Sequence, residues 1–233
     1  MSLAVAERGG AAETGPVGLQ VRRIIEERII TNDLRPGERL SENELSAQLG
    51  VSRQPVREAL IRLTEAGLVR VLPQRGTVVT RISVAHVSSA RFLREAVERA
   101  VVREAAGQAT AAAIQQMRAI IRAQEEATAG ENHARFLKLD DDLHRAFAAS
   151  IGHEDVWRTL QNVKLHMDRV RYLSLPDATP VARLLEQHTA IVDAIAAGDS
   201  LSAEAWMRQH LAELLKSLPR LVERLPDYFE QLE

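Results

Sequence analysis

Residues 41–63, SENELSAQLGVSRQPVREALIRL, constrain the fold more than any other stretch, because they contain the start and end signals of two short helices. Ser41, followed by Glu44 three residues later, forms the capping box that begins a helix. Gly50 falls where that helix must end in a left-handed residue, and Ser52 is placed to cap a second helix. The stretch therefore predicts a helix-turn-helix.

The second of these helices has the composition of a DNA-reading helix. Its apolar residues recur at helical spacing and give it one buried face. Its N-terminal end and opposite face carry hydroxyl, amide and guanidinium groups: Ser52, Arg53, Gln54 and Arg57. Such groups reach base edges and phosphates in the major groove. An Arg-rich amphipathic helix can also be a solvated surface helix, but the order of caps, turn glycine and following hairpin favours DNA binding.

The flanking segments complete a winged helix-turn-helix over residues 17–82. We expect a disordered tail at 1–16, a helix at 19–31 and a turn at 32–40. Beyond the second helix, residues 68–71 and 77–81 alternate as short strands, which predicts a β-hairpin, or wing, with Arg75 and Gly76 at its tip.

Residues 83–233 read as an antiparallel helical bundle, so the predicted fold class is mostly α. Helices are expected at 84–106, 109–128, 132–150, 154–175, 180–197 and 200–218, with a short seventh allowed at 220–231. The sequence has no cysteine, which excludes disulfides and thiolate metal sites. It has neither a membrane-length apolar run nor a signal-peptide pattern, so we expect a cytoplasmic protein without membrane contact.

The charge balance differs between the two parts. Residues 17–82 hold 11 Arg against 8 Asp and Glu, whereas residues 83–233 hold 18 Lys and Arg against 22 Asp and Glu. A mildly basic front part and an acidic remainder fit a DNA-binding module joined to another domain.

Three of the seven histidines, His144, His188 and His210, fall on separate bundle helices among apolar residues at helical spacing. Asp140 lies one turn before His144. Three imidazoles and one carboxylate that converge inside a bundle would bind a divalent ion. A single inward histidine is more often a hydrogen-bonded core residue, and Asp141 at i−3 leaves the register open. His166 could line the same cavity. The remaining three read as surface or capping residues: His86, His133 and His153.

Residues 34–79, LRPGERLSENELSAQLGVSRQPVREALIRLTEAGLVRVLPQRGTVV, resemble the GntR family of bacterial transcription regulators. The resemblance implies that Arg53 and Arg57 are the main DNA contacts, with Ser52 and Gln54 assisting and Gly76 letting the wing approach the minor groove. The family often has a basic residue where this chain has Asn43, so we expect Asn43 to contact DNA without supplying charge, and the operator preference to be altered.

The helical part resembles the effector-binding FCD domain of the FadR-type branch of this family. Metal-binding members have an Asp and a His one turn apart, then single histidines on two later helices. Asp140, His144, His188 and His210 match that order and spacing. The resemblance therefore implies a divalent ion (zinc, nickel or manganese, with zinc preferred) and a homodimer. A metal-free pocket, as in acyl-CoA-binding relatives, is the alternative.

Four protein ligands leave coordination positions that a small organic acid could occupy. Arg91 and Arg94 could clamp its carboxylate, or could form ordinary surface ion pairs. We expect a repressor that binds a pseudo-palindromic operator as a homodimer and is released by a carboxylate such as a sugar acid or dicarboxylate. The same geometry would allow a ligand that strengthens binding. A tethered metalloenzyme is the competing class, but the sequence has no nucleophile elbow, H-E-x-x-H or phosphate loop.

Overall fold

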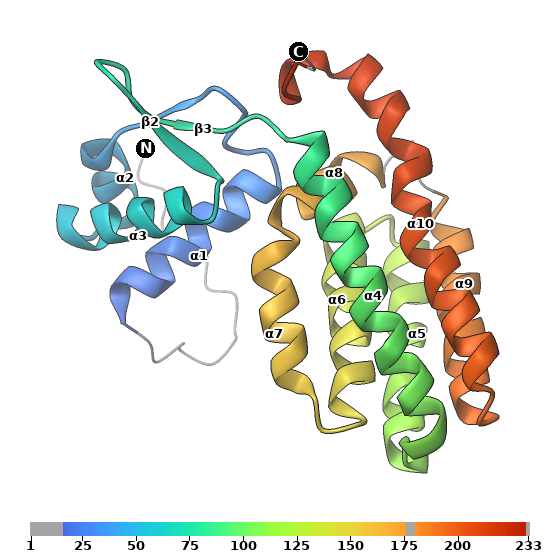
Figure 1. Ribbon diagram of the computed structural model, residues 1–233. Helices are drawn as coiled ribbons and strands as arrows, with labels where there is room; N and C mark the ends of the chain where they lie inside the picture. Colours follow the sequence, from blue (N-terminus) through green and yellow to red (C-terminus); the bar gives the residue numbers. More distant parts are fainter. Residues whose placement is uncertain (1–15, 176–179, 232–233) are drawn as a thin grey trace. The chain divides into compact units, whose positions relative to one another are not determined.

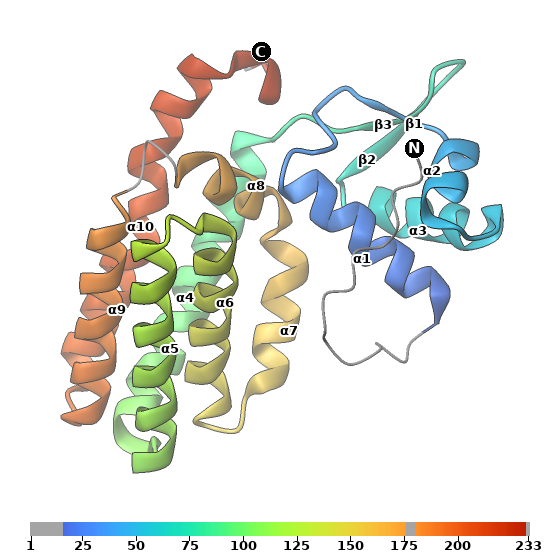
Figure 2. The same cartoon turned by 180° about the vertical axis from the view of Figure 1, so that it is seen from behind.

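A computed structural model describes residues 16–175 and 180–231, and the tail expected at 1–16 lies, apart from Pro16, outside them. The chain divides into two compact units, Met1–Arg81 and Ile82–Glu233. The predicted fold class is confirmed: a helix-turn-helix with a small sheet in the first unit, and helices in the second (Figures 1 and 2). No helix in the described part of the chain is long and apolar enough to cross a membrane.

The first unit contains α1 (Val17–Ile30), α2 (Glu42–Leu49) and α3 (Arg53–Glu65). The Ser41 hydroxyl accepts a hydrogen bond from the Glu44 N–H at 3.4 Å, and Gly50 adopts φ 67°, so both boundary signals act as the sequence predicts. Ser52 occupies the N-cap position of α3, but among the described residues its side chain makes no capping hydrogen bond. Its hydroxyl is therefore not committed to the helix.

A three-stranded sheet forms the wing. Strands β1 (Arg39–Leu40), β2 (Val69–Leu72) and β3 (Gly76–Val79) pair in the order β1-β3-β2, both pairs antiparallel. The reading of residues 32–40 as a turn alone was wrong, because β1 lies within them. Two residues are too short for an alternating pattern to show, and β1 exists only through its pairing with β3.

The second unit is a bundle in which α10 packs along α4 and α9, and α5 packs along α6 and α9 (Figures 1 and 2). Five of its helices have these bounds: α4 (Val84–Gln108), α5 (Ala111–Ala129), α6 (His133–Ala149), α9 (Val181–Ala196) and α10 (Ser200–Arg224). A shared core holds them together through large side chains such as Met117, Phe147, Trp157 and Met207. Polar residues on the inward faces therefore meet in a buried interior.

The single helix expected at 154–175 is two helices, α7 (Glu154–Val163) and α8 (Leu165–Ser174), separated at Lys164. The Lys164 side chain is 2% exposed, and its ammonium meets Asp141 Oδ2 at 2.9 Å and Asp168 Oδ2 at 2.6 Å. The break occurs where the chain turns this lysine inward. Helical periodicity cannot register such a contact, because it depends on a residue in α6.

The end expected at Leu218 and the seventh helix were also wrong. α10 continues through Pro219 to Arg224, and a 3-10 turn at Pro226–Tyr228 follows. A proline inside a helix removes a hydrogen bond, but Leu218 and Leu221 on either side are buried against Ile82 and Phe229. Ile82 and Phe229 also form a parallel β-bridge, in which the Ile82 N–H donates to Tyr228 O at 2.8 Å and the Glu230 N–H donates to Ile82 O at 3.0 Å.

Candidate metal centre and nucleic-acid interface

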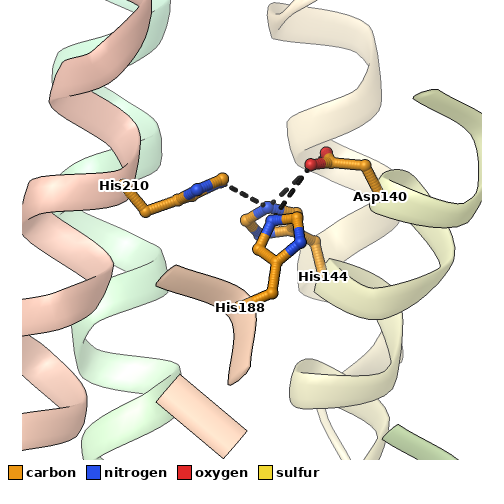
Figure 3. A group of neighbouring side chains, drawn as sticks. All are labelled: Asp140, His144, His188 and His210. Atoms are coloured by element: carbon orange, nitrogen blue, oxygen red, sulfur yellow. Dashed lines mark hydrogen bonds and ion pairs between the residues drawn. The ribbon is translucent and has the colours of Figure 1, made fainter. Parts of the chain in front are cut away.

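Asp140 and His144 of α6, His188 of α9 and His210 of α10 point toward one another inside the bundle (Figure 3). All four are buried, and one ligand atom of each lies within 4.8 Å of the others. The shared core brings α6, α9 and α10 together, so residues far apart in sequence form one compact cluster.

A second polar group fixes each imidazole from behind. The Nδ1 of His144 meets Glu98 Oε2, that of His188 meets Gln124 Oε1 at 2.9 Å, and that of His210 meets Gln187 Oε1 at 3.3 Å. Burial would raise the pKa of Glu98, but the Arg94 guanidinium and His144 outweigh it and lower that pKa to about 2. An ionised carboxylate only accepts hydrogen bonds, so the His144 Nδ1 carries the proton.

The Nε2 atoms consequently face the centre of the cluster as acceptors. His144 Nε2 lies 3.2 Å from His210 Nε2, and His188 Nε2 lies 3.2 Å from Asp140 Oδ1. His188 Nε2 is buried and has no hydrogen-bond partner among the described residues. Opposed lone pairs beside a carboxylate are unfavourable without a cation, and imidazoles oriented by second-layer acceptors are typical of metal ligands. These residues fit a divalent metal ion.

The electrostatics keep the donors in the states that metal binding needs. Burial would raise the pKa of Asp140, but the Arg171 guanidinium outweighs burial and holds that pKa well below its usual range. Burial lowers the pKa of His188, and lowers that of His210 further. The cluster therefore offers an ionised carboxylate and two imidazoles, those of His188 and His210, that resist protonation.

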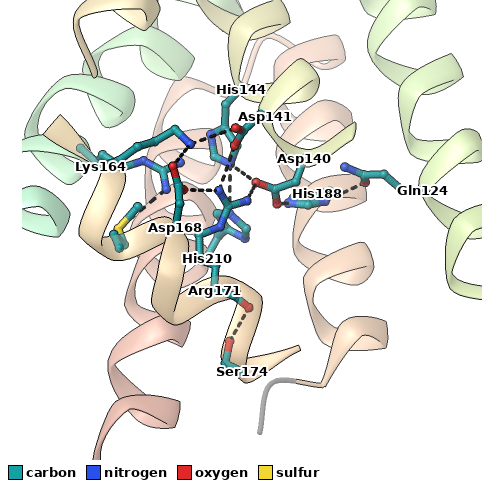
Figure 4. A network of polar contacts seen from close by, with 12 residues as sticks. Gln124, Asp140, Asp141, His144, Lys164, Asp168, Arg171, Ser174, His188 and His210 are labelled. Carbon is teal, nitrogen blue, oxygen red and sulfur yellow. Dashed lines mark hydrogen bonds and ion pairs between the residues drawn. The ribbon is translucent and has the colours of Figure 1, made fainter. Parts of the chain in front are cut away.

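A network of buried and partly buried charges supports the cluster from α8 (Figure 4). Arg171 pairs with Asp140 Oδ2, with Asp141 Oδ1 at 2.9 Å and with Asp168 Oδ1 at 3.0 Å. Lys164 joins Asp141 and Asp168 from the other side. Asp141, the i−3 alternative, thus lies against cations alone, whereas Asp140 lies between Arg171 and the histidines.

A cavity adjoins the cluster at Asp140 and His210. Its other polar lining groups are Arg94, Arg171, Ser174 and Glu213, and the rest of its wall is leucine and methionine. Sequence reasoning missed Arg171 and Glu213. Arg171 lies one turn after Asp168 and two turns after Lys164 on a charged helix face, which is a weak signal. Glu213 is three residues after His210 on the same helix.

The three residues expected to bind the effector lie in different surroundings. Arg94 lines the cavity, and its Nε donates to Glu98 Oε1 at 2.5 Å. Arg91 forms an ion pair with Glu95. His166 is buried with its ring 5.4 Å from that of His86. Neither Arg91 nor His166 is among the residues that line this cavity.

The residues expected to contact DNA gather on the first unit. Arg53 and Arg57 of α3 share a surface hollow with Asn43 and Gly76. The side chains of Arg53 and Arg57 are 66% and 64% exposed, and both lie 3.4 Å from Glu42, which holds them on the same side. The geometry leaves both guanidiniums accessible to a phosphate or base edge.

The remaining DNA candidates are exposed residues of α3 and of the hairpin. Ser52 and Gln54 are exposed at the start of α3, and Arg75 is exposed at the hairpin. Arg39 of β1 lines the hollow of Arg53 and also an adjacent hollow with Arg75. Arg39 was missed because its segment was read as a turn. Gly76 has φ 76°, and a Cβ there would lie 3.4 Å from Arg39 Nε, so glycine suits this close approach.

Comparisons with known proteins place both units. Residues 90–213 match the FCD domain, and residues 18–79 match bacterial regulatory proteins, gntR family. The HTH-type transcriptional repressor RspR of Escherichia coli (strain K12) is 38% identical over 218 residues, which cover 94% of this chain and 96% of that protein. The probable D-xylose utilization operon transcriptional repressor of Paenarthrobacter nicotinovorans is 29% identical, over 85% of this chain and 87% of its own. The solved structure of E. coli McbR/YncC shares the fold, with a TM-score of 0.76 at 18% identity over 90% of this chain and 99% of that chain.

Proposed function

We propose that this chain, which belongs to the GntR family of bacterial regulatory proteins, is a repressor controlled by a small carboxylate. Its family makes it a DNA-binding transcription regulator rather than an enzyme. The carboxylate would bind at a divalent metal ion held by Asp140, His144, His188 and His210. The repressor assignment is supported by the relatives that carry that name.

The shared hollow of α3 and the wing supports an operator contact through Arg53 and Arg57, assisted by Asn43, Ser52, Gln54, Arg75 and Gly76. One winged helix offers few base contacts. We therefore propose a homodimer that reads a pseudo-palindrome, with one recognition helix on each half-site. Dimerisation through the helical unit would leave α3 of each copy available to DNA.

One observation carries the metal and effector proposal: three buried imidazoles present Nε2 to a carboxylate at the edge of a cavity lined by Arg94 and Arg171. A bound divalent ion would supply an open coordination position for a ligand oxygen. Arg171 and Arg94 provide positive charge in the same cavity, which favours an anion. Three nitrogens and one oxygen suit zinc, and nickel or manganese can use the same donors.

Effector binding can change operator affinity only if it favours one arrangement of the two recognition helices. α4 carries Arg94 and Glu98 and begins two residues after the boundary between the units. A ligand that engages Arg94 therefore acts on the helix that leads directly from the DNA-binding unit. We propose that this releases the operator.

The test combines a thermal-shift screen of carboxylates with operator binding. Zinc-loaded wild-type protein and His188→Ala are screened, and each hit is titrated into a fluorescence-anisotropy assay on a duplex selected from a random pool. We expect hits that stabilise the wild type more than the variant and weaken operator binding. A hit that stabilises both proteins equally would remove the metal from the ligand site. A wild-type-specific hit that leaves operator affinity unchanged would disprove the coupling.

A further inference from the structure

Glu213 is a buried acid inside the cavity that the proposed function assigns to an anion. It lies on α10, one turn after His210, with 5% of its surface exposed, and it lines the cavity together with Arg94 and Arg171. A site that only needed to attract a carboxylate would be weakened by a second negative charge in its wall. Attraction of an anion therefore does not explain why an acid lies in the cavity wall.

Three side chains contact the same carboxylate oxygen of Glu213. Lys216 Nζ lies 2.8 Å from its Oε2, Arg183 Nε lies 3.3 Å from the same oxygen, and Gln187 Nε2 donates to that oxygen at 3.4 Å. The two cationic side chains are about half exposed, at 53% and 46%, and neither lines the cavity. They pair with Glu213 from the solvent side and are not presented to a ligand.

Glu213 is also tied to the metal cluster. Gln187 donates to Glu213 through Nε2 and meets the His210 Nδ1 through Oε1. One amide therefore orients a metal ligand and a cavity acid at the same time. This arrangement fixes Glu213 relative to the end of the cavity where the effector carboxylate would bind.

The remaining wall defines the body of the ligand. Six lining residues are apolar: Leu137, Met167, Leu175, Leu184, Leu211 and Leu214. A carboxylate such as that of Glu213 only accepts hydrogen bonds, so a ligand group placed against it must be a donor. A second ligand carboxylate there would face a like charge in a partly desolvated site.

We propose that Glu213 is a specificity-determining residue that selects a monocarboxylate carrying a hydroxyl or ammonium donor and an apolar body, and that it rejects dicarboxylates. This inference rests on the proposed function, because the acid end of the ligand is assigned to the metal and Arg171. It narrows the effector class: dicarboxylates are excluded, and a polyhydroxylated acid is disfavoured by the apolar wall.

Matched acids test the inference on the zinc-loaded full chain. One series is hexanoate, 6-hydroxyhexanoate, 6-aminohexanoate and adipate, and a shorter series is butyrate, 4-hydroxybutyrate, 4-aminobutyrate and succinate. Affinity is measured by calorimetry and thermal shift. In at least one series, the hydroxy or amino acid should bind about tenfold tighter than the plain acid, as expected for a hydrogen bond to a charged group, and the dicarboxylate about tenfold weaker.

Variants separate Glu213 from the rest of the site. Glu213→Gln should lose the preference for the amino-substituted carboxylate and bind the dicarboxylate with about tenfold higher affinity than the wild type does. Glu213→Asp should keep the wild-type order of affinities. Glu204→Gln is the matched control, since Glu204 lies on the same helix but pairs with Arg99 outside the cavity. Zinc content is measured for each variant, so that a lost metal is not mistaken for lost selectivity.

The outcomes distinguish a failure of the role assigned to Glu213 from a failure of the proposed function. If all acids of each series bind alike to the wild type, or if Glu213→Gln keeps the wild-type order, the carboxylate site stands and the role of Glu213 is wrong. If no acid binds the zinc-loaded wild type, the proposed function fails together with this inference.

Discussion

Replacing His188 with alanine removes one imidazole from the centre of the metal cluster. The side chain is fully buried, its Nδ1 is held by Gln124 at 2.9 Å, and its ring stacks on Phe136 with centroids 6.4 Å apart. The substitution therefore costs about 2–5 kcal/mol of packing and hydrogen bonding whether or not metal is present. Comparing the stability of each protein with that of its own metal-free form cancels this cost and leaves the stabilisation that the metal contributes.

The expected magnitude follows from binding linkage. Zinc at a hundred times its Kd stabilises the native state by about 2.7 kcal/mol, which for a unit of this size raises Tm by roughly 5–10 °C. Losing a second-layer partner of a metal ligand already costs about 10–100-fold in affinity, so losing a ligand should cost at least about a hundredfold. At the same zinc concentration the stabilisation then falls to about 0.4 kcal/mol, or about 1 °C.

The assay is thermal unfolding of EDTA-stripped and zinc-supplemented protein, with bound zinc measured by mass spectrometry. His153→Ala serves as the control, because His153 is exposed at the start of α7 and lies outside the cluster. The control should keep the full zinc-dependent rise in Tm. The reasoning would be refuted by a His188→Ala protein with wild-type zinc content and a wild-type rise in Tm.

The remaining predictions concern the DNA-binding unit and assembly. Arg53→Ala should weaken binding to a selected operator by about 1–3 kcal/mol and relax its sequence preference, whereas Arg158→Ala, which removes an exposed arginine of the helical unit, should leave both unchanged in anisotropy titrations. Ser41→Ala should destabilise the winged unit by about 1 kcal/mol, because it removes the acceptor for the Glu44 N–H; equal denaturation midpoints would contradict this. Sedimentation equilibrium should show a dimer at micromolar concentration, and a monomer with and without DNA would overturn the two-half-site reading.

Features with local causes could be predicted from the sequence, whereas features with long-range causes could not. The capping by Ser41 and the left-handed Gly50 depend on residues within four positions, and both are found as expected. The break at Lys164 depends on Asp141 in another helix, and the passage of α10 through Pro219 depends on burial against a distant segment. Proline and periodicity rules describe one helix at a time and cannot weigh such contacts.

The same division holds in the candidate site. His144, His188 and His210 stand among apolar residues at helical spacing, so their inward direction could be predicted. Arg171 belongs to the site because it pairs with Asp140, which is 31 residues away in the sequence. Glu213 belongs to the site because it lines the cavity. Nothing in the neighbouring residues of either distinguishes it from a solvated charge on a helix face.

The β-bridge at Ile82 has a mechanical consequence. Both backbone groups of Ile82 are hydrogen-bonded to the segment around Phe229, and on the other side the Thr80 N–H donates to Leu68 O at 2.9 Å within the wing. Rotation about the Ile82 backbone would break two hydrogen bonds, and rotation at Thr80 would disturb the wing. Between these two anchored residues, Arg81 can change its two backbone dihedral angles without breaking the hydrogen bonds described here. A change in the tilt of α4 would therefore have to be accommodated at a single residue rather than along a longer linker.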